Sequence, residues 1–481
     1  MKKAICLLLA LLMLMPLSAC FDKKEVTNEP QENTPAGEED RLAYLPDKKF
    51  NDDFIIVCRD NGEEFFRESA EGDRVDYAIY MRNRNIEARY GVEIKYKNMA
   101  YNLIPGWVSD ILKANDQKSM DIVNNHIVYT SNIPLANNAL DLQTAPYMDF
   151  SKDWWEPSTL NDLTLNGKTF IAIGDMCTSA IGATYCVYYN KQLTEEYKIP
   201  DMYELAIEQG GWTYQKMLEF ISDIRFDLNK DGKYNMRDRF GLVCTGGSFI
   251  NAYIWAWDNP IFKKNENTGE LEFSFMKDEN KISRLFRNLT NLYRQVDGVY
   301  LASGTYGSEM FVNDRAVFYN STFGSAASDL RDMQSEKWGI VPYPKYNDKQ
   351  KQYITAVDGG HNAICVPRTS NETKLEKIGI VTEALNCMSH DVVIEFYDKG
   401  LKSKYLGDPK EAKAIDLIMD NRVFDFGYIY LAFDSPAFWL QNMIPGGDKD
   451  IVNKYLRERN NLEDVIESAY EAFGLTFAGL A

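Results

Sequence analysis

The residues best suited to hold a cation stand in one short loop, residues 227–238. Oxygen-bearing side chains occupy positions 1, 3, 5, 9 and 12 of this loop, and Gly232 stands at position 6, where the chain must turn sharply. Calcium takes about six to eight oxygen ligands in flexible geometry, so the spacing predicts a structural calcium site. The loop departs from the usual pattern because Asp238 replaces the bidentate Glu at its last position. The predicted ligands are Asp227, Asn229, Asp231, the backbone carbonyl of Lys233, Asn235 and Asp238; the alternative is a plain turn rich in Asp and Asn.

Sequence motifs of catalytic sites are mostly missing. The chain has no GxSxG, HExxH or GxGxxG pattern, and it has only three His in 481 residues. Residues 166–169 are similar to the end of a phosphate-binding loop, but Asp162 stands where that loop needs Gly. A formal charge of −18 disfavours nucleic acid as a partner. We therefore expect a protein that is not an enzyme, although the carboxylate pair of a glycosidase stays open as an alternative.

The first twenty residues predict export and membrane attachment. Lys2 and Lys3 precede an apolar run over residues 4–15, which is too short to span a bilayer and is typical of a signal peptide. Cys20 follows small residues and resembles the lipid-bearing Cys of bacterial lipoproteins, which implies cleavage after residue 19 and acyl chains on Cys20. The alternative is an ordinary secretory signal. Residues 20–50 are rich in Glu, Asn and Pro and are predicted to be a flexible tether. The expected location is the outer face of the cytoplasmic membrane.

Cysteine usage gives no sign of a disulfide framework or a zinc site. The Cys residues beyond Cys20 have no CxxC spacing, and most stand in apolar runs, so buried free thiols are the favoured interpretation. A bridge between Cys177 and Cys186 stays open.

The order of elements that would position these residues indicates an α/β fold. Apolar runs predict strands at residues 54–58, 92–96, 120–123, 169–173, 186–189, 316–319 and 362–366. Helices are expected at residues 75–89 and 105–115, behind Thr213, behind Asn371, and over residues 451–469. This alternation predicts mostly parallel sheets.

A series of phrases resembles one family, the bacterial extracellular solute-binding lipoproteins (family 1) that deliver sugars to ABC importers. The maltodextrin-binding protein is a distant relative. The phrases are residues 146–155, 166–175, 189–191, 210–213, 227–242, 311–319, 339–346, 401–405 and 420–427. The resemblance implies a monomer of two α/β lobes with the ligand in the cleft between them. It places the crossing segments near residues 174–182, 354–360 and 402–408. Lobe 1 is then residues 51–177 plus 357–404, and lobe 2 is residues 178–356 plus 405–481.

Within this resemblance, the ligand contacts are expected on loops that face the cleft. Sugar recognition needs planar polar groups for hydroxyls and rings for C–H faces. The loop around His126 lacks the stacking ring that relatives have there. Trp255 and Trp257 are two residues apart and would share one face of a strand. The candidate residues are Arg59, Asp60, Asn125, His126, Phe249, Tyr253, Trp255, Trp257, Phe323, Asp358, His361 and Trp439.

Two classes of function follow from the sequence. The favoured one is a lipoprotein that captures a carbohydrate, most simply an oligosaccharide, and passes it to membrane permease subunits. The alternative is a surface lipoprotein that hydrolyses glycans or binds them without transport. Peptides, lipids or ions as ligands would give the same sequence pattern.

Overall fold

The computed structural model describes residues 40–59, 62, 64–265, 267–405, 409–448 and 450–480. The predicted signal peptide, Cys20 and most of the predicted tether lie outside the described residues, as does Asp60. Residues 42–481 form one compact unit. No helix in the described part of the chain is both long and apolar enough to cross a bilayer.

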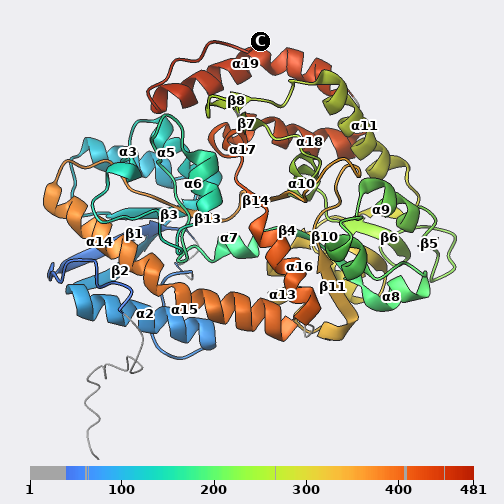
Figure 1. Cartoon of the computed structure of the whole chain (residues 1–481), viewed down its shortest axis with the longest axis horizontal. Helices are drawn as coiled ribbons and strands as arrows, with labels where there is room; N and C mark the ends of the chain where they lie inside the picture. Colours follow the sequence, from blue (N-terminus) through green and yellow to red (C-terminus); the bar gives the residue numbers. More distant parts are fainter. Residues whose placement is uncertain are drawn as a thin grey trace, which may run out of the picture. The chain divides into compact units, whose positions relative to one another are not determined.

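The first lobe is built on a four-stranded sheet in the order β13-β3-β1-β2 (Figure 1). β1 runs parallel to both β2 and β3, and β13 returns from a distant part of the chain to pair antiparallel with β3. The helix α2 packs on β2, and α14 packs on α2. The bounds are β1 Asp52–Cys58, β2 Val92–Asn98, β3 Ile122–His126, β13 Asn362–Cys365, α2 Arg74–Tyr90, α3 Ile104–Lys113, α4 Ile127–Thr130, α5 Asn132–Leu135, α6 Pro157–Leu163 and α14 Glu372–Met388.

The second lobe is built on a six-stranded mixed sheet, in the order β11-β4-β10-β6-β5, with β9 also on β6. β10 is parallel to β6 but antiparallel to β4, so the prediction of mostly parallel sheets is wrong for this lobe. Its strands are β4 Tyr185–Asn190, β5 Arg225–Phe226, β6 Arg239–Cys244, β9 Val299–Leu301, β10 Ala316–Thr322 and β11 Trp338–Val341. Its helices are α8 Lys191–Glu196, α9 Tyr214–Ile221, α10 Ser248–Ala256, α11 Glu279–Gln295, α12 Tyr306–Val312, α13 Gly324–Ala327, α16 Pro409–Asp420, α17 Phe426–Tyr430 and α18 Pro436–Gly446. A small hairpin joins β7 Phe262–Lys264 to β8 Leu271–Phe273.

Local signals explain where several helices begin. The Thr213 hydroxyl accepts a hydrogen bond from the Lys216 amide at the start of α9, as the sequence predicts. The Asn371 side chain does the same for α14. Such side chains satisfy backbone N–H groups that have no partner within the helix.

Three connections link the lobes. The first passes through α7 (Ser179–Gly182) and reaches β4. The second returns along β12 (Thr355–Ala356), which pairs with β14 (Arg422–Val423). The third is a π-helical segment, η5 (Ile394–Tyr405), which follows α14 and α15 (His390–Val393) and contacts α2 of the first lobe and α13 and α16 of the second. The predicted crossing at residues 402–408 lies only partly within the described residues. The lobe boundaries in the sequence stay a prediction.

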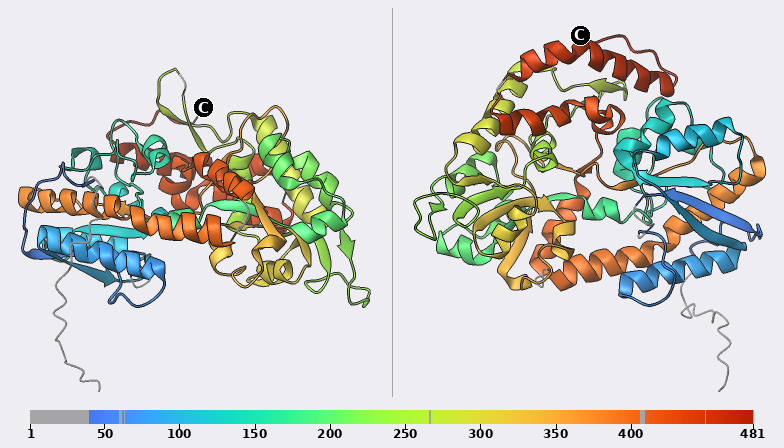
Figure 2. Two further views of the ribbon diagram at one scale, coloured as in Figure 1. Left: turned by 60° about the horizontal axis from the view of Figure 1, so that its bottom comes forward. Right: turned by 180° about the vertical axis from the view of Figure 1, so that it is seen from behind.

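The last helix, α19 (Ile451–Ala472), contacts α11 of the second lobe and α5 of the first (Figures 1 and 2). The residue after it, Phe473, is fully buried. Its ring packs against Phe170 of the first lobe and against Phe426 and Tyr430 of α17, with centroids 4.9, 5.6 and 5.2 Å away. The C-terminal segment therefore holds elements of both lobes together.

The structure differs from one sequence expectation and confirms another. In place of the strand expected at residues 169–173, Ala172 forms an isolated bridge with Ile364. Within the described part of the chain, Cys177 and Cys186 are free buried thiols, together with Cys58, Cys244, Cys365 and Cys387.

Candidate functional site

The loop after β1 is fixed to the second crossing segment. The Arg59 guanidinium donates one hydrogen bond from Nε to Asn362 Oδ1 (2.7 Å) and another to the carbonyl oxygen of Gly360. Arg59 is half-buried. The sequence predicts Arg59 as a ligand contact; the structure adds that its side chain holds the loop against the hinge.

A buried carboxylate joins the same loop to both crossings. Glu64 accepts hydrogen bonds from the backbone amide of Ser179 (2.6 Å) and from Asn362 Nδ2 (2.5 Å). The backbone amide of Asn362 in turn donates a hydrogen bond to Ser179 Oγ (3.0 Å). Burial raises the pKa of Glu64, while these hydrogen bonds and Arg59 oppose the shift. Sequence reasoning missed Glu64, because the pair Glu63–Glu64 carries no local motif.

Aromatic side chains at the ends of β2 and β3 form a cluster. The centroid of the Tyr129 ring lies 4.8 Å from that of Tyr101 and 5.1 Å from that of His126. Tyr101 is 41% exposed. The buried Asn125 side chain donates to the Tyr101 carbonyl oxygen (3.2 Å), so this predicted ligand residue positions the loop. Tyr101 and Tyr129 place aromatic rings beside His126, where the sequence analysis expected no ring.

The cluster continues onto the other lobe. The Phe433 ring lies 5.3 Å from Tyr129, and Phe438 lies 5.2 Å from Phe433. Phe433 is 54% exposed. We call Tyr101, His126, Tyr129, Phe433 and Phe438 the aromatic row. Tyr101 follows β2 by only a few residues, so the rule that ligands meet the carboxyl ends of strands could have found it. Phe433 has no comparable signal in the sequence.

The second crossing carries Asp358 and His361 beside this row. The Asp358 carboxylate accepts hydrogen bonds from Tyr185 Oη (2.5 Å) and from the Gly360 amide (2.8 Å). His361 is buried, and its Nδ1 lies 2.5 Å from the Asp358 carbonyl oxygen. Burial lowers the pKa of His361 to about 4, so its ring is neutral at physiological pH.

The expectation of a strand around Trp255 is wrong. Residues 248–256 form the helix α10, and Trp255 is 1% exposed. Its Nε1 donates to Asp425 (2.9 Å). Trp257, which caps the helix, packs between Tyr214 and Tyr346, and Tyr253 hydrogen-bonds Asn320. In this structure Tyr253, Trp255 and Trp257 are buried side chains of the second lobe, and Trp255 also lines a cavity described below.

The remaining predicted contacts lie at different depths. Phe249 is half-buried, with its ring 6.0 Å from Tyr185. Phe323 is buried in front of α13. Trp439 is buried on α18, and its neighbour Phe438 carries the half-buried ring of the aromatic row. The structure thus brings Arg59, His126 and Asp358 together around the second crossing segment.

The predicted calcium loop turns at Gly232, whose φ is +76°, as the spacing requires. Its carboxylates accept hydrogen bonds from the loop's own amides: Asp227 from Asp231 and Gly232, and the buried Asp238 from Leu228 and Asn235. Each such oxygen keeps a second lone pair, so the donor set is chemically compatible with a hard cation. Across the described residues, no group of three or more His, Cys, Asp or Glu is arranged to hold a metal ion. The calcium site stays a prediction.

The arrangement as a whole combines exposed rings with anchored polar groups at a hinge, which suits reversible binding of a ligand. Comparison with known proteins identifies the family. Residues 84–377, more than half of the chain, match the family model of the bacterial extracellular solute-binding proteins. The chain belongs to this family. The family is one of binding proteins rather than enzymes, and it implies a place outside the cytoplasm.

Solved structures with the same fold agree. A Staphylococcus aureus extracellular solute-binding protein in complex with maltose is 12% identical and has a TM-score of 0.56, covering 88% of this chain and 99% of that one. UgpB from Mycobacterium tuberculosis, in complex with glycerophosphocholine, is 14% identical with a TM-score of 0.56, covering 86% and 98%. The maltose/maltodextrin-binding domain from Bdellovibrio bacteriovorus, bound to maltotriose, is 14% identical with a TM-score of 0.52, covering 88% and 98%. No curated protein sequence matches this chain. The predicted fold of two α/β lobes is confirmed.

Proposed function

We propose that this protein is the carbohydrate-capturing component of an ABC importer, anchored through lipid on Cys20 at the outer face of the cytoplasmic membrane, which delivers its ligand to permease subunits. The aromatic row carries the proposal, because its rings come from both lobes. A ligand that contacts both lobes at once favours their closure and needs no chemistry.

The chemistry of the row suits sugar rings. Aromatic faces pack on C–H groups, while planar polar side chains nearby pair with hydroxyls. Maltose and maltotriose are bound by two of the similar structures, which supports a saccharide. The glycerophosphocholine complex of a third makes that compound the natural competitor in a test.

The decisive experiment is calorimetric titration of the mature chain with maltose, maltotriose and glycerophosphocholine, preceded by a thermal-shift screen over oligosaccharides. Burying a ring against a sugar face contributes about 1–3 kcal/mol, so Tyr129→Ala should weaken saccharide binding about tenfold or more. Tyr77→Ala is the matched control, because Tyr77 is an exposed Tyr on α2, outside the row.

Equal affinity in both variants would show that the ligand lies elsewhere. Release of shorter sugars by the purified protein would instead support the hydrolase alternative.

A further inference from the structure

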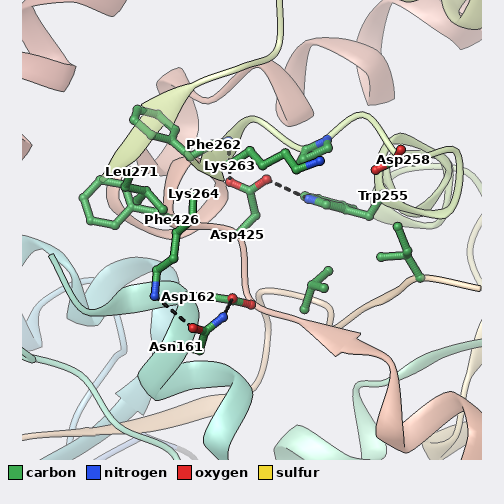
Figure 3. A pocket seen from close by; sticks show the side chains of 13 residues that line it. Asn161, Asp162, Trp255, Asp258, Phe262, Lys263, Lys264, Leu271, Asp425 and Phe426 are labelled. Atoms are coloured by element: carbon green, nitrogen blue, oxygen red, sulfur yellow. Dashed lines mark hydrogen bonds between the residues drawn. The ribbon is translucent and has the colours of Figure 1, made fainter. Parts of the chain in front are cut away.

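A cavity of about 280 Å³ lies apart from the aromatic row, where α6 of the first lobe approaches the second (Figure 3). Asn161 and Asp162 on α6 form one wall, and the β7–β8 hairpin and the start of α17 form the opposite wall. Ile354, which precedes β12, and Val423, which lies in β14, complete the lining of the cavity. Trp255, predicted as a ligand contact, forms part of the lining.

Two of the three acidic residues that line the cavity, Asp425 and Asp162, accept hydrogen bonds from the protein itself. Asp425 accepts hydrogen bonds from Trp255 Nε1 (2.9 Å) and from the backbone amides of Ile261 (2.6 Å), Phe262 (3.3 Å) and Gly427 (2.8 Å). Asp162 accepts from the Phe424 amide (2.9 Å). These hydrogen bonds stabilise the two carboxylates within the protein itself.

A hydrogen bond between two lining residues joins the walls that the two lobes contribute. Lys264 donates from Nζ to Asn161 Oδ1 (2.9 Å), and Asn161 donates from its amide to Asp162 (2.9 Å). Figure 3 shows the Lys264 side chain extending toward Asn161. Asp258 and Lys263 also line the cavity, and both are exposed residues. The rest of the lining is largely apolar and includes Trp255, Phe262, Leu271, Ile354, Val423 and Phe426.

The volume limits what this surface can hold. Drug-sized ligands occupy pockets of about 300–1,000 Å³, and a dry apolar cavity of about 150 Å³ holds benzene. At the volume per non-hydrogen atom that benzene has in such a cavity, about 280 Å³ accommodates roughly ten non-hydrogen atoms. That is one flat bicyclic ring system, and less than a disaccharide.

We propose that this cavity is a second ligand site, which takes a small uncharged aromatic compound of the size of indole. Trp255 links it to the aromatic row, because its ring lies 5.0 Å from Tyr428, and Tyr428 stacks on Phe438 at 5.2 Å. Since both lobes supply its walls, an occupant favours the lobe arrangement in which those walls face each other. The proposal does not depend on the identity of the transported solute.

The test is calorimetric titration of the mature chain with indole, alongside thermal unfolding at increasing indole concentration. A ligand that binds only the folded state raises the unfolding temperature. We expect one indole per chain. Val423→Phe places a ring in the cavity and should weaken indole binding about tenfold or more. Ile354→Phe fills it from a different position and serves if the first variant does not fold. Tyr129→Ala should leave indole binding unchanged.

Two results would overturn the proposal. One is the absence of binding at millimolar indole. The other is binding that survives both Phe substitutions but is lost in Tyr129→Ala, which would place the probe on the aromatic row.

Discussion

Replacing Phe473 by Ala tests whether the C-terminal segment holds the lobes together. The Phe473 side chain is fully buried, and its ring contacts Phe170 in the first lobe and Phe426 and Tyr430 in α17. The Phe473 carbonyl oxygen also accepts a hydrogen bond from Asn166 Nδ2 (2.9 Å), which the substitution keeps. Removing a buried Phe ring costs about 3–5 kcal/mol, as lost transfer energy plus the cavity left behind.

The assay is guanidinium-induced unfolding combined with hydrogen exchange. Phe473→Ala should lower the free energy of unfolding by about 3–5 kcal/mol. It should also speed exchange at residues 166–173 of the first lobe more than within the six-stranded sheet. Phe477→Ala is the matched control, because Phe477 is half-buried and its ring contacts Tyr470, 5.3 Å away. If Phe473→Ala costs no more than the control, the cluster does not join the lobes and our reasoning is wrong.

Three further outcomes are expected. Chelation should lower the melting temperature of the wild-type protein, and added calcium should restore it. Neither treatment should change the melting temperature of Asp227→Ala. If calcium does not change the wild-type melting temperature, the loop is a plain turn. Cys20→Ser should release the protein from membranes, and unchanged membrane fractionation of that variant would contradict lipidation. Burial raises the pKa of Asp425 from 3.8 to about 6, so the folded protein holds this proton more tightly than the unfolded chain does. The resulting contribution to the free energy of unfolding is fully present below about pH 4 and is lost as the pH rises through about 6. At about 1.4 kcal/mol per pKa unit this is about 3 kcal/mol, and Asp425→Asn should flatten that part of the stability profile measured by denaturant titration from pH 4 to 7.

Much of the fold was predictable because its signals are local. Apolar runs marked β1, β4, β10 and β13 within a few residues of their bounds, since a buried strand needs continuous apolar side chains. Thr213 and Asn371 marked the starts of α9 and α14, because a capping side chain bonds amides only a few residues ahead.

The site was less predictable, for the same physical reason. An apolar aromatic run such as residues 253–257 fits a buried strand and a buried helix equally well, and only packing on all sides made it α10. Arg59 was expected at a ligand, but its hydrogen bond to Asn362 joins residues 303 positions apart. No local pattern encodes such a pairing.

The sequence by itself determined the family, the α/β character, the absence of familiar catalytic motifs and the cation-like loop, because each depends on residue types at short spacing. The tertiary structure alone decided which side chains meet. Tyr129, which packs against Tyr101, reaches Phe433 only because the chain crosses between lobes and returns. Glu64 meets Ser179 and Asn362 through the same crossings. Contacts between distant segments depend on how the lobes are connected and packed, which local residue preferences do not specify.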